Sequence, residues 1–336
     1  MSTSLVVIFT IVVALAFDVI NGFHDAANSI ATIVSTRLLS PRRAVLWAAF
    51  FNFVALFVFH QGVAKTVSSL VKVNAADPGF VWVVLAGLIG AIFWNLLTWW
   101  LALPSSSSHA IMGGFSGAGL AYGGVRVLNL PKLALSAEFI VVSPMVGFFL
   151  GSILLVIVSW WLRDWRPLKV KRVFRYVRLV SAAAYSIGHG GNDAQKTMGI
   201  ILAVLIAGGY IDKNIAEGPT WIAIACYTAM GLGTAMGGWR IIKTLGTKLT
   251  KLRPHTAFCA ELSGAATLFG ATFLKIPVST THTITGAIVG VGSTMRRRGI
   301  RWGLASNIVW AWVLTIPASA GVGAGCLKLF QYAHLC

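Results

Sequence analysis

Long apolar runs recur along the whole chain and are separated by short polar segments. The runs Ala137–Leu162 and Trp302–Leu327 each exceed the roughly 20 mostly apolar residues that an α-helix needs to cross a lipid bilayer. Hydrophobic residues make up 57% of the chain and charged residues 11%. Because backbone groups in lipid must form their hydrogen bonds within each segment, the pattern predicts an all-α, polytopic protein whose partner is the lipid bilayer.

Positive charge predicts how the segments are oriented. Most of the 27 Lys and Arg residues lie in four short segments between apolar runs, which is typical of cytoplasmic loops. We therefore expect both termini to lie outside. The basic segments are Arg37–Arg43, Arg163–Arg178, Arg240–Arg253 and Arg296–Arg301.

The same assignment predicts six single segments and two interrupted pairs. The pair at residues 80–123 begins and ends outside, and the pair at Thr256–Thr294 begins and ends inside. Each half then has about three spanning helices plus one helical hairpin, in opposite orientations. The single segments are Leu5–Thr36, Ala44–Gly62, Ala137–Leu162, Leu179–Ala207, Trp221–Trp239 and Trp302–Leu327.

The net charge of +18 does not indicate a nucleic-acid partner. The basic residues lie in short loops, and no folded basic module accompanies them. Attraction of these loops to anionic lipid headgroups fits the pattern equally well.

Two sequence motifs occur once in each half of the chain, in the same order. Gly22–Ser29 resembles Gly190–Thr197, and Leu103–His109 resembles Ile276–His282. Inverted repeats with polar, helix-breaking segments at matching positions indicate a transporter site near the middle of the membrane. We therefore predict a first inverted repeat at residues 1–162, a basic cytoplasmic connector at 163–178, and a second inverted repeat at 179–336.

Two acids, Asp25 and Asp193, lie at the centre of the first motif and its copy, inside apolar spans. An unpaired carboxylate in hydrocarbon is costly, so each must face a cavity, a partner or a cation. We predict that they bind a coupling cation, either a proton or sodium, with Glu261 as a third candidate. The alternative is that they are structural acids that hold helices together. Nearby glycines, including Gly22 and Gly190, predict that both helices are broken there.

The duplicated segments also carry groups suited to a small oxyanion. Hydroxyls both donate and accept hydrogen bonds, and amides add further donors. Lys196 either contacts the anion directly or extends to the membrane interface. His24, His109 and His282 are candidates for proton transfer or for packing. The predicted oxyanion ligands are Asn28, Ser105, Ser106, Ser107, Asn192, Gln195, Lys196, Ser279, Thr280 and Thr281.

In these motifs the chain resembles the inorganic phosphate transporter (PiT, or PHO4-type) family over nearly all of its 336 residues. The resemblance implies phosphate uptake by symport across the cytoplasmic membrane, no cofactor beyond the coupling ion, and a homodimer. The family pattern has Asn where this chain has His24 and Lys196. A lysine in place of an amide that could ligate sodium favours protons as the coupling ion.

Two other functions compete with phosphate symport. A transporter of sulfate or another oxyanion would use the same hydroxyl-lined fold. An intramembrane serine protease is suggested by Gly114–Gly117, which matches a G-x-S-G pattern around Ser116. Ser116 has no counterpart in the second half, so the duplication does not support the protease.

Overall fold

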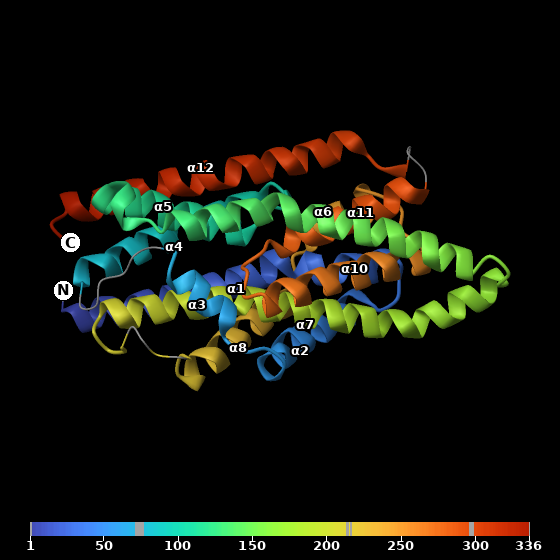
Figure 1. Cartoon of the computed structure of the whole chain (residues 1–336), viewed down its shortest axis with the longest axis horizontal. Coiled ribbons are helices and arrows are strands. Elements are labelled where there is room, and N and C mark those ends of the chain that lie inside the picture. Colours follow the sequence, from blue (N-terminus) through green and yellow to red (C-terminus); the bar gives the residue numbers. More distant parts are fainter. Residues whose placement is uncertain (1, 71–76, 213–214, 216, 296–298, 336) are drawn as a thin grey trace.

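The computed structural model is a bundle of helices, and most of the helices run along the long axis of the bundle (Figure 1). It describes residues 2–70, 77–212, 215, 217–295 and 299–335. Residues 71–76, 213–214 and 216, and Arg296–Arg298 of the last basic segment, lie outside the described residues. The α-helices are α1 (Thr3–Ser35), α2 (Pro41–Val54), α3 (Gly62–Ser68), α4 (Pro78–Trp100), α5 (Ser107–Gly123), α6 (Leu130–Trp161), α7 (Pro167–Ala207), α8 (Thr220–Met236), α9 (Trp239–Lys243), α10 (Pro254–Phe273), α11 (Thr280–Met295) and α12 (Trp302–Tyr332).

Several of these helices are long and apolar enough to cross a membrane. Within the described part of the chain, four qualify singly, and Pro41–Phe57 with Gly62–Ser68 forms a fifth candidate that bends by 87°. This confirms the predicted all-α, polytopic membrane architecture. The four single helices are Thr3–Ser35, Gly79–Trp100, Leu130–Trp161 and Trp302–Tyr332.

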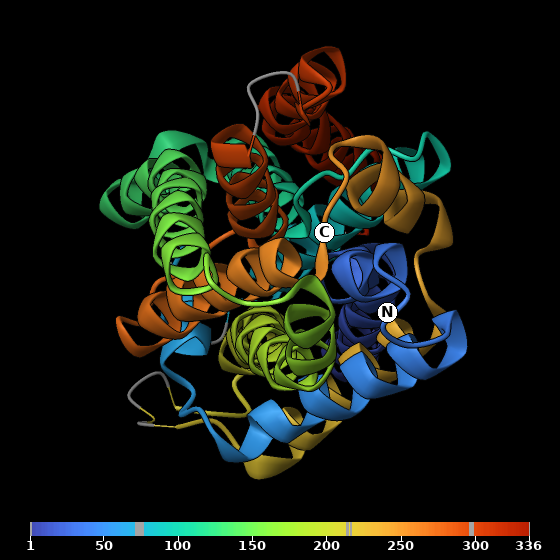
Figure 2. The same ribbon diagram turned by 90° about the vertical axis from the view of Figure 1, so that its right-hand side faces the viewer.

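Helix α7 begins earlier than the sequence pattern predicted. The basic segment was expected to be a connector up to Arg178, but the helix starts at Pro167 and includes most of that segment. Proline is favoured at the first helical position, and Lys and Arg are good helix formers. In the view along the long axis, α7 lies in the middle of the bundle (Figure 2), where it contacts α1, α2, α3, α8 and α10.

The predicted breaks at the two central acids are wrong. Helix α1 runs without interruption through Asp25, and α7 does the same through Asp193. The glycines serve close packing instead: a Cβ on Gly22 would lie 2.4 Å from the carbonyl oxygen of Met230, and one on Gly190 would lie 2.5 Å from that of Asn52. Small residues at such contacts let two helix backbones approach each other.

Interruptions occur elsewhere, and two of them are matched in detail. Two residues beyond the end of α4 lies Ala102 (φ 57°), and two residues beyond the end of α10 lies Lys275 (φ 61°), both in the left-handed region. In each case the next amide, Leu103 N or Ile276 N, donates to a carbonyl five residues back at 2.9 Å. This geometry closes a helix C-terminus, and proline commonly follows it. Pro104 and Pro277 therefore follow the ends of α4 and α10 and precede the starts of α5 and α11.

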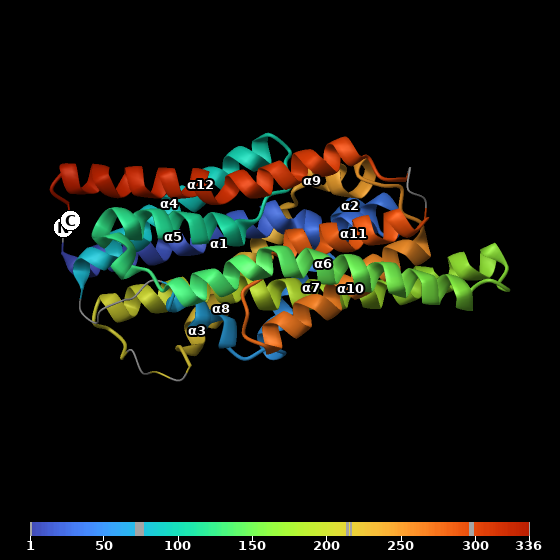
Figure 3. The same cartoon turned by 45° about the horizontal axis from the view of Figure 1, so that its top comes forward.

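The last helix of each half packs on the hairpin of the other half. Helix α6 contacts α10 and α11, and α12 contacts α4 and α5. The hairpin α4–α5 lies toward the end of the molecule that carries both termini, and α10–α11 lies toward the opposite end (Figures 1 and 3).

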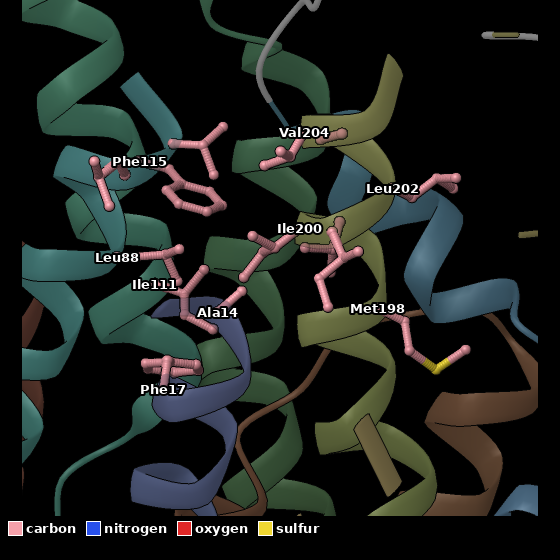
Figure 4. Close-up of a cluster of buried hydrophobic side chains, with 14 of the residues drawn as sticks. Ala14, Phe17, Leu88, Ile111, Phe115, Met198, Ile200, Leu202 and Val204 are labelled. Carbon is pink, nitrogen blue, oxygen red and sulfur yellow. The ribbon is translucent and has the colours of Figure 1, made fainter. Parts of the chain in front are cut away.

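Two apolar clusters lie along the bundle with a polar layer between them. On α1, one cluster ends at Phe17 and the other begins at Ala27. On α7, one ends at Tyr185 and the other begins at Ala194. Figure 4 shows part of the cluster that contains Phe17, where side chains of α1, α4, α5 and α7 meet. The polar layer between the clusters contains Asp25 and Asp193.

Candidate functional site

The two hairpins bring helix N-termini to the polar layer. Ser106 is the N-cap residue of α5, and its hydroxyl accepts a hydrogen bond from His109 N at 3.3 Å. Ser279 caps α11 in the same way, accepting from His282 N at 3.2 Å. Such termini present free N–H groups and the positive end of the helix dipole, which favours negative charge.

Asp25 is surrounded by donors from three helices. The hydroxyl of Ser107, in the first turn of α5, donates to Asp25 Oδ2 at 3.0 Å. The hydroxyl of Thr281, in the first turn of α11, donates to Oδ1 at 3.4 Å. His24 Nδ1 lies 2.7 Å from the same Oδ1. Asp25 is buried, so these contacts replace the water that a carboxylate would otherwise bind.

Asp193 has a different set of partners that includes a full positive charge. Lys196 Nζ lies 2.5 Å from Asp193 Oδ1 and also donates to Ser108 Oγ at 2.6 Å and to the carbonyl oxygen of Val278 at 2.7 Å. Thr280 donates to Asp193 Oδ2 at 3.0 Å. Because Lys196 is buried, it does not extend to the membrane interface. It is an internal counter-ion for Asp193 in the polar layer.

The two acids meet across the α1–α7 contact. One oxygen of each carboxylate and one ring nitrogen of His189 all lie within 4.8 Å of one another. His189 Nε2 is 3.3 Å from Asp193 Oδ2, and His189 Nδ1 is 3.2 Å from Asn52 Oδ1. Two carboxylates and an imidazole, all buried, form a candidate cation site.

His189 was missed by the sequence reasoning. The signal that could have found it is its spacing: His189 lies four residues before Asp193, on the same face of α7. That relationship holds only if the helix is continuous, and the glycines between the two residues predicted a break.

Six of the predicted oxyanion ligands either contact Asp25 or Asp193 or contact a side chain that does so. Asn28 Nδ2 donates to Thr281 Oγ1 at 2.9 Å, and it lies 3.5 Å from Thr280 Oγ1. Ser105 Oγ is 2.8 Å from Thr98 Oγ1 and 3.4 Å from His24 Nε2. The six residues are Asn28, Ser105, Ser107, Lys196, Thr280 and Thr281.

The other four predicted ligands have structural partners. Ser106 and Ser279 cap helices, as described above. Asn192 binds the second hairpin, since its Oδ1 accepts from Val278 N and its Nδ2 donates to the carbonyl oxygen of Ile276, each at 3.2 Å. Gln195 Oε1 accepts from Val63 N at 2.9 Å and therefore faces α3, away from the hydroxyls of the hairpin tips.

Glu261 lies in a separate ion pair. Its Oε1 is 2.7 Å from Arg178 Nη2, and its Oε2 accepts from Ser181 Oγ at 2.5 Å. Arg178 also donates to the carbonyl oxygen of Thr32 at 3.0 Å, which ties α7 to α1 and α10. Both charged side chains are buried. Glu261 thus has a buried cationic partner, its role in binding the coupling ion stays a prediction, and Arg178 lies inside the bundle instead of in a loop.

Two of the histidines left open by the sequence pack against each other. The rings of His109 and His282 form an edge-to-face contact with centroids 4.3 Å apart, and His282 stacks on Trp312 at 3.7 Å. This favours a packing role at the hairpin tips. His24, in contrast, belongs to the Asp25 network, because its Nε2 lies 3.1 Å from Thr98 Oγ1.

Comparisons with known proteins agree with this geometry. A model of the phosphate transporter family matches residues 21–323. A probable low-affinity inorganic phosphate transporter of Rhizobium meliloti (strain 1021) is 54% identical over 318 residues, covering 94% of each chain. A protein of Bacillus subtilis (strain 168) with the same name is 48% identical, covering 94% of this chain and 95% of its own.

A solved structure described as the sodium-dependent phosphate transporter has the same fold. Its TM-score is 0.89 at 24% identity, and the match covers 97% of this chain and 99% of that one. The family match spans most of the sequence and includes Asp25, Asp193 and both hairpin tips. The chain therefore belongs to the phosphate transporter family, a family of membrane transporters and not of enzymes.

Proposed function

We propose that this protein is a secondary active symporter that moves inorganic phosphate together with a cation by alternating access. The observation that carries the proposal is the meeting of Asp25 and Asp193 within 4.8 Å, where the hydroxyl-bearing tips of α5 and α11 converge. Hydroxyls that donate and accept suit a tetrahedral oxyanion that carries protons. The two helix N-termini add favourable dipoles for an anion.

Electrostatics explains why a cation must accompany the anion. Two carboxylates at this separation repel each other by about 3 kcal/mol or more at an effective dielectric constant of about 20. Lys196 compensates Asp193 but leaves Asp25 without a full positive charge, because His24 and His189 are cationic only when protonated. Binding of one further cation neutralises the pair and removes the repulsion that phosphate would otherwise meet.

The contacts of Lys196 support a proton over sodium as that cation. Its ammonium group is bound by three oxygens, those of Asp193, Ser108 and Val278. These are the kinds of ligand that a sodium ion would need there. Sodium at Asp25 and Asp193 is the alternative, and the name of the structural neighbour makes it worth testing.

The repeated element order supports an inverted repeat across residues 1–162 and 179–336. Each half has a long helix, a shorter helix followed by a short helical segment, a hairpin with matched turns and a final long helix, and the hairpins lie toward opposite ends of the bundle. The termini lie at the end opposite the basic α6–α7 turn (Figure 1), which supports placing both outside the cytoplasmic (inner) membrane. Exposed apolar side chains on α6 and α12 suit lipid or the second subunit of a homodimer.

Sulfate is the competing substrate. Phosphate retains a proton near neutral pH and can donate it to an acceptor such as Asp25, whereas sulfate cannot. The protease alternative is wrong, because the family consists of transporters.

Uptake into proteoliposomes tests the proposal. Radiolabelled phosphate is supplied outside, and an inward proton gradient and an inward sodium gradient are imposed separately, with sulfate as competitor. We expect accumulation with the proton gradient and little inhibition by a tenfold excess of sulfate. Equal uptake without any gradient would contradict symport, and accumulation driven by sodium alone would replace the proton with sodium.

A further inference from the structure

A second acid of α1, Asp18, is fully buried and has no ion-pair partner in the described part of the chain. Its relative exposure is 0%, and neither carboxylate oxygen makes a hydrogen bond there. Asp18 directly follows Phe17, which lies in the apolar cluster of Figure 4. An ionised carboxylate in such surroundings costs several kcal/mol, so it must be neutralised. The repeat does not explain it, because Asp18 lies outside both duplicated motifs.

The neighbours of Asp18 do not supply the missing charge. Asn21 and Thr197 come close to its carboxyl group, and Asn21 Oδ1 and Thr197 Oγ1 also lack hydrogen-bond partners among the described residues. The charged groups that act on it are Asp193 and Lys196 of α7, and Lys196 is already paired with Asp193. Helix α8 contributes the titratable side chains Cys226 and Tyr227, both uncharged near neutral pH. Helix α4, which also packs on α1, has no ionisable side chain.

A cavity opens at the surface beside α8. It has a volume of about 230 Å³ and lies between the bend that joins α2 to α3 and the start of α8. His60 and Glu217 line it with side chains that are 97% and 61% exposed, 3.7 Å apart. Gln195 and Tyr227 line it from buried positions.

The buried wall of this cavity carries unused polar groups. The hydroxyl of Tyr227 and the Nε2 of Gln195 lie close to each other, and neither has another partner among the described residues. Tyr227 is also within electrostatic range of Asp18. Tyr227 thus both lines the cavity and interacts electrostatically with the buried acid, and its hydroxyl can both accept and donate a proton.

We propose that Asp18 is a proton-binding site, loaded through the cavity lined by His60, Glu217 and Tyr227, and distinct from the Asp25–Asp193 centre. This rests on the proposed proton-coupled symport. A hydronium ion in the cavity loses one O–H bond and becomes water, while one O–H bond forms at the Asp18 carboxylate, which becomes a neutral acid. Release reverses this step, so no other reactant is needed.

The position of Asp18 links proton binding to the central site. Asp18 and Asp25 lie seven residues apart, about two turns of α1, so they share a helix face and are separated by about 10 Å along the axis. The polar layer thus holds three acids and one lysine. Protonation of Asp18 lowers the negative charge of the layer before phosphate binds.

The variant Asp18→Asn tests the proposal, with Glu138→Gln as the matched control, because Glu138 is an exposed acid of α6. Two processes are measured in proteoliposomes: uptake driven by a proton gradient, and exchange of internal for external phosphate at equal pH. We expect Asp18→Asn to lose at least nine-tenths of driven uptake, to retain exchange within about twofold, and Glu138→Gln to resemble wild type.

Each other outcome has a defined meaning. If wild type itself shows no proton-driven uptake, the proposed symport fails, and this inference fails with it. If wild type shows it and Asp18→Asn retains it, only this inference is overturned. Loss of both driven uptake and exchange in Asp18→Asn would assign the acid a structural role and would also overturn this inference. A selective loss of sodium-driven uptake in this variant would overturn it as well.

Two further measurements do not depend on the asparagine variant being active. Infrared spectra of the purified protein at neutral pH should contain a carbonyl band of a buried protonated carboxylic acid that is missing in Asp18→Asn; absence of a difference would contradict the proposal. Tyr227→Phe should slow proton-driven uptake several-fold without slowing exchange. Its control is Tyr176→Phe, at an exposed position of α7.

Discussion

Asp25 and Asp193 occupy equivalent positions in two halves of the chain, yet their partners differ by one charge. Asp25 accepts from neutral hydroxyls and lies against His24, whereas Asp193 is bound by the ammonium group of Lys196. Their carboxylate oxygens come within 4.8 Å of each other. The pair is thus already half neutralised by the protein, and one more positive charge completes it.

Replacing either acid should remove the coupling. Asp25→Asn and Asp193→Asn keep the shape of the side chain but remove the charge that the cation binds. We expect phosphate uptake driven by a proton gradient to fall below a tenth of wild type in each variant, with normal amounts of folded protein in the membrane. Wild-type uptake in either variant would exclude that acid from the mechanism.

The hydroxyls at the hairpin tips should determine phosphate affinity. Thr280→Val removes the donor to Asp193 without changing the side-chain volume, and Thr280→Ser keeps it. We expect the KM for phosphate to rise about tenfold or more in the valine variant, as removal of a charge-assisted hydrogen bond predicts, and to stay near wild type in the serine variant. Ser116→Ala serves as a control outside the site. Equal KM values for Val and Ser at position 280 would show that the hydroxyl does not bind substrate.

Lys196 should set which cation is used. The variant Lys196→Asn introduces the amide that the family pattern has at this position and removes the internal positive charge. We expect it to lose proton-driven uptake at low sodium and to gain stimulation by sodium, because a second cation must then bind beside Asp193. Uptake measured over a range of sodium concentrations decides this. A variant that transports like wild type and ignores sodium would mean that Lys196 is not a substitute for a bound cation.

The Arg178–Glu261 pair should contribute to stability. Breaking a buried ion pair by removing one partner costs about 3–5 kcal/mol. Arg178→Met should therefore lower the melting temperature in detergent strongly, and the double variant Arg178→Met/Glu261→Gln should recover part of the loss. If Glu261→Gln instead melted like wild type but lost proton-driven uptake, Glu261 would be a coupling residue, as the sequence had suggested.

Close helix contacts make some glycines irreplaceable. A Cβ at Gly22 would lie 2.4 Å from the carbonyl oxygen of Met230, so Gly22→Ala must push α1 and α8 apart. Overpacking of this kind costs about 1–3 kcal/mol. Gly321→Ala in α12 is the matched control, since a Cβ there meets no atom within 4 Å. Thermal melting that distinguishes the two variants is expected; equal melting would argue against the tight contact.

The sequence predicted the all-α architecture, several long apolar helices and the two hairpins, because apolar runs and duplicated motifs depend on the local pattern. It did not predict which polar side chains hold helices together and which face the site. Gln195 and Asn192 look like ligands in the motif, but their partners, Val63 and Val278, come from other helices. Glycine is equally ambiguous: near Asp25 and Asp193 it permits a break or a close contact, and only the neighbouring helix decides.

We propose that phosphate binds where the tips of α5 and α11 meet the two acids. Arsenate has the shape and charge of phosphate and scatters anomalously, so crystals grown with arsenate locate the anion directly. We predict an anomalous peak beside Asp25 and Asp193, placed so that arsenate oxygens lie within hydrogen-bond distance of Ser107 and Thr280. A peak only in the basic cavity lined by Lys248, Lys251 and Arg253, with none at the hairpin tips, would contradict the account.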